Sequence, residues 1–177
     1  MKKFFLNIIV LLLGMASCYA QNHAVATNRK DFLRGLNNFS QDISFVQMDP
    51  KYTRQRAPFN YINREAYEAF IKMWEAAKQD GINLTIISGA RTFLTQKTVW
   101  DRRWNESTLP AGAARVKHLL RYSALPGCSR HHWGTDIDLN ANRTDYWRTT
   151  TGKMVYQWLC ENAHKFGFYQ PYSAKGT

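Results

Sequence analysis

The stretch SRHHWGTDIDLN, residues Ser129–Asn140, decides how the rest of the chain is interpreted. It gathers two histidines, one glycine and two aspartates within a dozen residues. Residues 135–139 alternate between polar and apolar types, which is typical of a half-buried β-strand. Gly134, just before this strand, permits the backbone angles of a sharp bend. The sequence therefore predicts a strand that carries Asp136 and Asp138 on one face.

The loop that enters this strand carries His131, seven residues before Asp138. A neutral imidazole and a carboxylate together suit a borderline-soft divalent cation, above all zinc. A hydrogen-bonded structural pair is the alternative. Asp136 would repel Asp138 unless a cation or a proton lies between them, or it would bind a positively charged group of a substrate. His132 is expected either to support this site from behind or to pack beside Trp133.

Two ligands are too few for a catalytic zinc, which takes three protein groups and needs a general base nearby. The chain contains one Glu-x-x-His sequence, Glu161–His164. The neighbouring apolar residues define the buried face of the same predicted helix, and this pair lies off that face. We therefore expect Glu161 and His164 to be exposed residues rather than the missing base and ligand.

The sequence around this stretch predicts short strands among longer helices. Apolar residues at a spacing of three and four predict one face of a helix over residues 64–80, with Asn63 as its cap and Gly81 as its end. A buried strand follows over 82–88. Residues 21–60 are interpreted as a lead-in with little regular structure. A helix containing Phe93, Val99 and Trp104 is expected after Gly89. Two more helices are expected over residues 113–122 and 152–166, and a strand over residues 168–172. The fold class is thus α+β in a single domain.

The first twenty residues have the pattern of a secretory signal peptide, with Lys2 and Lys3 before an apolar run. Lipidation at Cys18 is the alternative, and either outcome predicts an exported protein of the periplasm or cell envelope. Removing this leader lowers the formal net charge from +11 to +9. Such a balance favours an anionic wall or membrane surface over nucleic acid as the partner, or it reflects an ordinary solvated surface. Cys128 and Cys160 would either pair or remain free.

Three blocks of the chain resemble the M15 metallopeptidases, the D-alanyl-D-alanine carboxypeptidase family of the VanY type. PGCSRHHWGTDIDLN (Pro126–Asn140) is similar to the family signature Ser-x-His-x-x-Gly-x-x-x-Asp. SGARTFLTQ (Ser88–Gln96) resembles its Ser-Gly-x-Arg-Ser-x-x-x-Gln element, although Thr92 replaces the second serine. WLCENAHKFGFYQPY (Trp158–Tyr172) resembles its last helix and strand. Cys128 departs from the family's usual threonine or serine.

The resemblance implies a peptidase domain over residues 61–177 with a small antiparallel sheet flanked by helices, as in hedgehog and D,D-peptidase folds. It also implies Zn²⁺ at the sheet, held by His131 and Asp138. The family's third histidine and its general base lie in a Glu-x-Trp-His element, which we expect beyond Thr177 in a longer protein. Arg91 would hold the scissile carbonyl oxygen or a substrate carboxylate. Ser129 and Gln96 match positions that line the family's substrate groove, to which the residue analysis adds Asp136.

The implied function is zinc-dependent removal of D-alanine from peptidoglycan stem peptides, with no nucleic-acid partner and no obligate protein partner. The alternatives are a non-catalytic peptidoglycan-binding module of the same fold, a peptidoglycan endopeptidase, and an L,D-carboxypeptidase.

Overall fold

The computed structural model describes residues 29–171, so the predicted leader over residues 1–20 lies outside the described part of the chain. The elements follow in the order α2 (Arg29–Arg34), β1 (Phe45–Gln47), β2 (Tyr61–Asn63), α3 (Arg64–Gln79), β3 (Ile86–Ser88), α4 (Phe93–Glu106), α5 (Ala113–Leu120), η1 (Arg130–Trp133), β4 (Asp138–Leu139), α6 (Thr144–Arg148), α7 (Thr150–Asn162) and η2 (Ala163–Phe166).

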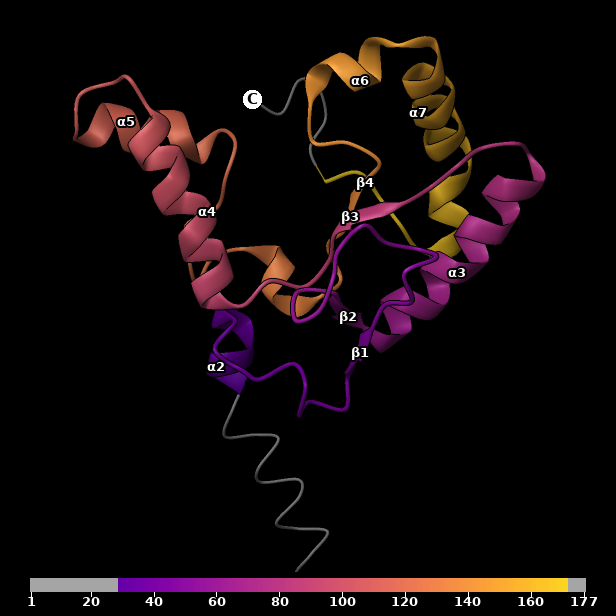
Figure 1. Cartoon of the computed structure of the whole chain (residues 1–177), viewed down its shortest axis with the longest axis horizontal. Coiled ribbons are helices and arrows are strands. Elements are labelled where there is room, and N and C mark those ends of the chain that lie inside the picture. The colour runs from indigo at the N-terminus through magenta and orange to yellow at the C-terminus, as the bar shows by residue number, and fades with distance from the viewer. Residues whose placement is uncertain (1–28, 172–177) are drawn as a thin grey trace, which may run out of the picture.

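The strands form two small antiparallel sheets, β1 with β2 and β3 with β4. In Figure 1, α4 and α5 lie on one side of the β3–β4 pair, α3 and α7 lie on the other, and α6 lies above the pair. The register of this pair sets Ile86 opposite Leu139 and Ser88 opposite Asp138, with an irregularity between them. The predicted α+β fold with a small antiparallel sheet flanked by helices is therefore confirmed.

Helix α3 forms one wall of the main core, and the predicted cap is present. The Asn63 side chain accepts hydrogen bonds from the backbone N–H groups of Glu65 and Ala66, which are unpaired at a helix start. The face of α3 predicted from its apolar spacing is the buried one, and it packs with residues of β2, β3 and α7. The fully buried side chains of this core include Ile62, Phe70, Met73 and Ile86.

Helix α7 packs against α3 and begins two residues earlier than the apolar spacing predicted. The side chain of Thr149 accepts a hydrogen bond from the N–H of Gly152 and so fixes the start of α7 at Thr150. Across the core, Trp158 donates its indole N–H to the Asp80 carboxylate, 2.7 Å away at the end of α3. The predicted strand over 168–172 is absent from its described part, residues 168–171.

The lead-in is more ordered than the sequence predicted. It contains α2 and β1, and β1 pairs with β2. Phe39 and Phe45 stack with ring centroids 4.4 Å apart and form a second core cluster with Ala90. Scattered aromatic residues without a clear period provide no local signal for this packing, because it depends on contacts with residues far along the chain.

The strand pair is shorter than expected. The predicted strand over 82–88 is regular only at β3, although Ile82 and Leu84 are buried. The predicted strand over 135–139 is regular only at β4. Gly134 has the predicted left-handed backbone, with φ of 71°, and a side chain there would collide with the Phe45 ring.

Both cysteines of the described region are free and exposed, so Cys128 and Cys160 do not pair in this structure. Between residues 29 and 171, no helix has the length and apolar character that a membrane crossing requires.

Candidate active site

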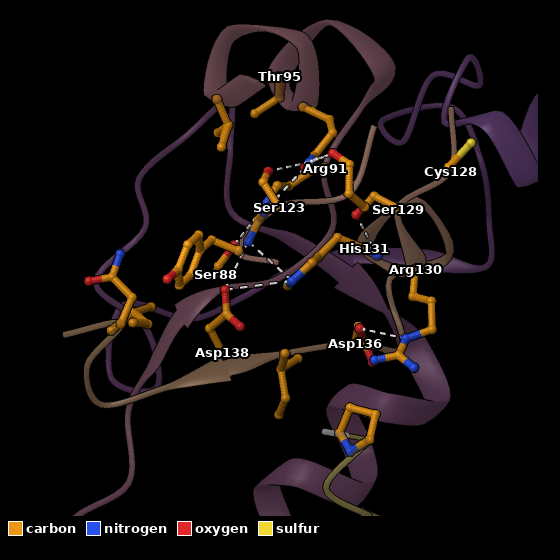
Figure 2. A pocket seen from close by; sticks show the side chains of 18 of the residues that line it. Ser88, Arg91, Thr95, Ser123, Cys128, Ser129, Arg130, His131, Asp136 and Asp138 are labelled. Atoms are coloured by element: carbon orange, nitrogen blue, oxygen red, sulfur yellow. Dashed lines mark hydrogen bonds and ion pairs between the residues drawn. The ribbon is translucent and has the colours of Figure 1, made fainter. Parts of the chain in front are cut away.

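A groove of about 1500 Å³ runs between the β3–β4 pair and the α4–α5 hairpin. Sites for small ligands usually span about 300–1,000 Å³, so this groove has room for an extended peptide. Figure 2 shows that the side chains of η1, β3 and β4 meet at one end of it. All six residues singled out from the sequence line the groove: Arg91, Gln96, Ser129, His131, Asp136 and Asp138.

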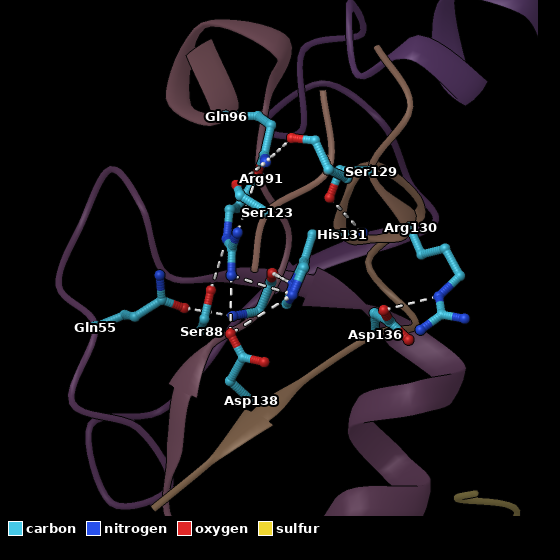
Figure 3. A network of polar contacts seen from close by, with 12 residues as sticks. Gln55, Ser88, Arg91, Gln96, Ser123, Ser129, Arg130, His131, Asp136 and Asp138 are labelled. Atoms are coloured by element: carbon cyan, nitrogen blue, oxygen red, sulfur yellow. Dashed lines mark hydrogen bonds and ion pairs between the residues drawn. The ribbon is translucent and has the colours of Figure 1, made fainter. Parts of the chain in front are cut away.

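Arg91 lies in the connection between β3 and α4, and every edge of its guanidinium group is engaged (Figure 3). Its Nε donates to Ser88 Oγ at 2.9 Å, and its Nη1 donates to Gln96 Oε1 at 3.0 Å. Its Nη2 donates to Asp138 Oδ2 at 2.8 Å and lies 3.1 Å from His131 Nε2. The side chain is 17% exposed. Arg91 is thus held in one orientation at the end of the groove.

Burial and neighbouring charges shift the electrostatics of this arginine and its partner. Burial lowers the pKa of Arg91, the carboxylate of Asp138 opposes that effect, and the like charge of Arg103 adds to it. Burial raises the pKa of Asp138, but the nearby His131 and Arg91 outweigh it, and the net pKa lies below the ordinary value. Asp138 is therefore a carboxylate at neutral pH and can act as an acceptor or as a metal ligand.

The orientation of His131 follows from the one-turn helix η1 in which it lies. Ser129 caps this turn by accepting from the N–H of His131 at 3.3 Å. The Nδ1 atom of His131 lies 2.9 Å from the carbonyl oxygen of Gly89. Because a carbonyl oxygen only accepts, Nδ1 carries the proton, and in the neutral ring the lone pair is on Nε2. That lone pair accepts from Arg91 Nη2 at 3.1 Å, and Nε2 lies 3.6 Å from Asp138 Oδ2.

The structure distinguishes between the two roles that were expected for His132. This histidine is fully buried, and it does not pack as a surface neighbour of Trp133. Its Nδ1 donates to the carbonyl oxygen of Arg91 at 2.7 Å, and its Nε2 accepts from the N–H of Gly127 at 3.0 Å. Burial lowers the pKa of His132, in agreement with a neutral ring that donates once and accepts once. His132 thus fixes the backbone on both sides of the groove end.

The two aspartates pair with different arginines. Asp136 accepts from Arg130 Nε at 3.0 Å, whereas Asp138 pairs with Arg91 (Figure 3). Each carboxylate has its own guanidinium group, so the repulsion that argued for a cation between them is relieved in another way. The strand alternation does not hold at Asp136 because the regular strand begins at Asp138.

Gln96 and Ser129 line the groove but use their polar atoms within the protein. Gln96 is 1% exposed, accepts from Arg91, and donates from Nε2 to the carbonyl oxygen of Ala124 at 2.7 Å. Ser129 is 4% exposed and caps η1. In this structure both residues position Arg91 and His131.

Three supporting residues were not identified from the sequence. Ser88 orients Arg91 Nε, and Gln55 accepts from the N–H of Gly89 at 2.7 Å. A side chain at Gly35, where φ is 72°, would overlap the ring of His132. Of these three residues, only Ser88 had a signal in the sequence, because it begins the family-like motif SGARTFLTQ. Gln55 and Gly35 belong to the segment interpreted as a lead-in, where no pattern linked them to a site.

The pair on α7 and η2 is placed as predicted. Glu161 and His164 are not buried and lie away from the groove lining, and Glu161 accepts a hydrogen bond from Gln157 on its own helix.

The donor set fits part of a zinc site. Two ligands bound at about 2.0–2.1 Å in tetrahedral geometry lie about 3.4 Å apart, and the spacing of His131 Nε2 and Asp138 Oδ2 is 3.6 Å. The hydrogen bond from Nδ1 to Gly89 is of the kind that orients metal-binding histidines. Across residues 29–171, no cluster of three His, Cys, Asp or Glu side chains is arranged to hold a metal ion. The described residues thus offer two donor atoms at a spacing that suits zinc ligands.

Comparison with protein families finds a match over residues 59–177 to the model described as "VanY: D-alanyl-D-alanine carboxypeptidase". The protein YodJ of Bacillus subtilis (strain 168) is 33% identical over 170 residues, which cover 93% of this chain and 58% of that protein. A D-alanyl-D-alanine carboxypeptidase of Enterococcus faecalis (strain ATCC 700802 / V583) is 32% identical over 107 residues, which cover 59% of this chain and 38% of that protein. The chain thus spans little more than half the length of the first relative and less of the second.

Two solved structures resemble this fold. A mutant of the vancomycin resistance D,D-pentapeptidase VanY from a VanB-type resistance cassette, in complex with Zn(II), is 28% identical with a TM-score of 0.57. That match covers 75% of this chain and 70% of the other. VanYB in complex with D-alanine-D-alanine is 28% identical with a TM-score of 0.58, covering 75% of this chain and 67% of the other.

Proposed function

The chain belongs to the VanY family of D-alanyl-D-alanine carboxypeptidases, and we propose that it removes the terminal D-alanine from peptidoglycan stem peptides. One observation carries the proposal: Arg91, His131 and Asp138 meet at the end of a peptide-sized groove, at the positions of the family motifs. The related structure with D-alanine-D-alanine bound supports the choice of substrate.

Arg91 is the residue that we assign to the substrate carbonyl oxygen or to a substrate carboxylate. Ser88 and Gln96 hold its guanidinium group at Nε and Nη1, so the N–H donors of Nη2, which contact Asp138 and His131 here, can pass to a substrate oxygen while the group keeps its orientation. Donors fixed in this way stabilise the negative charge that develops on oxygen during peptide hydrolysis. His132 holds the Arg91 backbone and so acts as a positioning residue.

We further propose that the reaction depends on zinc, with His131 Nε2 and Asp138 Oδ2 as two of the ligands. Their spacing, the tautomer of His131 and the ionised state of Asp138 support this assignment, as does the Zn(II) complex of a related protein. When bound, the ion would polarise the scissile carbonyl group and lower the pKa of a coordinated water. We assign the third ligand and the general base to a Glu-x-Trp-His element in a longer protein, as the family resemblance implies.

The test uses the full-length protein and a synthetic pentapeptide ending in D-alanyl-D-alanine. We expect release of one D-alanine per peptide, loss of release after chelation, and recovery with Zn²⁺. His131→Ala and Asp138→Asn should each abolish release and weaken zinc retention. His164→Ala, an exposed histidine just after α7, is the matched control and should leave both unchanged.

Three outcomes would redirect the proposal. Peptide binding without release, in protein that retains zinc, would indicate the non-catalytic peptidoglycan-binding module. Cleavage within cross-links would indicate an endopeptidase, and release only from a tetrapeptide would indicate an L,D-carboxypeptidase. Zinc retention equal in wild type and in both ligand variants would disprove the assignment of His131 and Asp138.

We also propose that the protein acts in the cell envelope, because its substrate is found there and the leader pattern over residues 1–20 predicts export. Cell fractionation with an antibody would test this location. Recovery of the protein with the cytoplasmic fraction would contradict it.

A further inference from the structure

The wall of the groove formed by α4 and α5 carries arginine side chains that the reaction centre does not use. Thr95, Val99, Arg102 and Arg103 all line the groove from α4. Their spacing of four and then three or four residues places them on one face of the helix. Arg121, which directly follows α5, lines the same groove. The wall therefore presents three guanidinium groups to the space that a bound peptide would fill.

None of these three arginines has a carboxylate partner among the described residues. Arg102, Arg103 and Arg121 form no ion pair between residues 29 and 171, although the groove contains two carboxylates. Those carboxylates, Asp136 and Asp138, pair with other arginines. Asp101 of α4 pairs with Lys97 on its own helix. The wall thus holds a local excess of positive charge.

Arg103 adds a buried donor to this wall. Its Nε has no hydrogen-bond partner within the described part of the chain. A buried N–H group without an acceptor is unfavourable, so a shift of this side chain that brings its Nε to a ligand oxygen would be stabilising. Charged acceptors form the strongest such bonds with guanidinium groups.

The position of the wall separates it from the reaction centre. Arg102 and Arg103 lie nine and ten residues beyond Phe93, the first residue of α4, or about 14 Å along the axis at 1.5 Å per residue. Helical side chains lean toward the N-terminus, so both arginines lean back toward the end of the groove that holds Arg91. A ligand group at the wall would therefore lie several ångströms from the bond at Arg91, farther along the peptide.

We propose that Arg102 and Arg103, assisted by Arg121, form a subsite for a carboxylate in the part of the peptide that precedes the scissile bond. This inference rests on the proposed function and names its substrate class: stem peptides that bear a free carboxylate two or three residues before the terminal D-alanine that is released. The two sources in such peptides are the α-carboxylate of a γ-linked D-glutamate and the side-chain carboxylate of diaminopimelate. A lysine at the third position would place a like charge beside the wall.

A peptide suits this wall better than an anionic surface does. The three arginines line the same groove as Arg91, whereas Lys97 and Lys117 of the same hairpin are exposed and do not line it. A flat membrane or polymer surface would meet the exposed lysines first. A peptide lying in the groove would meet the arginines.

The test measures binding and D-alanine release separately, with five pentapeptides that end in D-alanyl-D-alanine. Two have a free D-glutamate carboxylate and carry diaminopimelate or lysine at the third position. The other three carry diaminopimelate, and in them the D-glutamate carboxylate, the diaminopimelate side-chain carboxylate, or both are converted to the amide. The full chain is compared with Arg102→Gln/Arg103→Gln and with the charge-matched control Lys97→Gln/Lys117→Gln. Dissociation constants are measured by calorimetry, and KM and kcat by D-alanine release.

We expect removal of the relevant carboxylate to weaken wild-type binding about tenfold, with kcat nearly unchanged, as for the loss of one or two charge-assisted bonds. The arginine double variant should bind all the diaminopimelate peptides equally and weakly, whereas the lysine double variant should discriminate as the wild type does. The amide conversion that weakens wild-type binding, at D-glutamate or at diaminopimelate, identifies the carboxylate that the subsite binds.

Equal wild-type affinity for the free and the doubly amidated peptides would overturn the proposal without using any variant. An equal loss of affinity for all five peptides in the arginine variant would also overturn it, because that result indicates a general electrostatic effect of the arginine charges rather than a subsite. So would loss of binding to anionic phospholipid vesicles in the arginine variant with peptide discrimination intact. Absence of D-alanine release from every peptide, measured with protein that carries a Glu-x-Trp-His element, would disprove the proposed function, while the dissociation constants would still decide the subsite.

Discussion

The two sides of the groove differ in how their charged groups are partnered. At the β3–β4 end, Arg91 is held by Ser88, Gln96 and Asp138, and the lone pair of His131 faces the same carboxylate. Along α4 and α5, the arginines that line the groove form no ion pair with a described residue. The first side is organised before a ligand arrives, and the second becomes neutralised only when an anion binds.

The two sides also differ in how they are supported from behind. His132 and Gln96, which hold the reaction centre, are 0% and 1% exposed. On the hairpin, the buried residues of α4 and α5 are Gln96, which faces the centre, and Leu119. Preorganised donors favour chemistry, because no reorientation is needed as charge develops. A less supported wall suits recognition of a variable part of the substrate.

The largest effect is expected for His132→Ala. The change removes both hydrogen bonds of a buried ring, leaves the Arg91 carbonyl and the Gly127 N–H without partners, and opens a cavity beside Gly35. We expect a loss of about 3–4 kcal/mol in the free energy of unfolding, measured by urea denaturation. His164→Ala, at an exposed site, should change it by less than about 0.5 kcal/mol. Similar values for the two variants would show that His132 does not hold the centre.

The next effect concerns the reaction rate, and the change is Arg91→Lys. Lysine keeps the positive charge but cannot bond with Ser88, Gln96 and Asp138 at once, because it lacks the planar guanidinium group. We expect kcat for D-alanine release to fall about 100-fold, which corresponds to about 2.7 kcal/mol of transition-state stabilisation.

The matched control for this prediction is Arg64→Lys. Arg64 is exposed and donates to the carbonyl oxygen of Ile43, away from the groove. It should keep kcat within about twofold of the wild type. A rise in KM alone for Arg91→Lys would indicate that Arg91 binds the substrate in its ground state rather than stabilising developing charge.

A smaller effect on stability is expected for Leu119→Ala on the hairpin. Leu119 is 4% exposed but lies outside both core clusters, so the surrounding side chains can relax into the space it leaves. We expect a loss of about 1–2 kcal/mol, with faster hydrogen exchange confined to α4 and α5. Leu84→Ala in the main core, at 2% exposure, should cost about 2–5 kcal/mol and affect the whole domain. Equal costs would mean that the hairpin and core form one cooperative unit.

The same contrast explains how much of the molecule could be predicted from its sequence. Asn63 and the apolar spacing after it predicted α3 because a cap and a helical face are local features. The motifs singled out His131, Asp138 and Arg91 as site residues, and all three line one groove, while their roles stay predictions.

Features that depend on distant contacts could not be predicted. His132 contacts Gly35 and the backbone of Arg91 and Gly127, and these contacts come from three separate segments. The strand alternation placed Asp136 beside Asp138, but the ion pair with Arg130 and the left-handed bend at Gly134 confine the regular strand to a shorter stretch. Residues 29–60 carry no periodic signal, because their aromatic rings pack on remote residues.

The smallest effect is expected in the turn that leads into β1, beneath the reaction centre. The Asp42 carboxylate accepts from the N–H and hydroxyl of Ser44 and from the side chain of Asn37. Burial raises the pKa of Asp42, but these hydrogen bonds outweigh it and hold the net pKa below the ordinary 3.8. A carboxylate whose folded pKa is depressed stabilises the protein above pH 3.8, and this contribution is lost as pH falls through the folded pKa.

Asp42→Asn should therefore lower the free energy of unfolding by about 0.5 kcal/mol at pH 7, since the site is partly exposed to solvent. The difference between variant and wild type should shrink below pH 3.8 and vanish in strong acid. Comparing the two proteins at each pH cancels the titration of Asp138 and other carboxylates that both retain. This turn precedes Phe45, which packs against Gly134. If the hydrogen bonds of the reaction centre hold it independently of this turn, kcat should change less than about twofold. A larger drop in kcat would show that the centre depends on the segment beneath it.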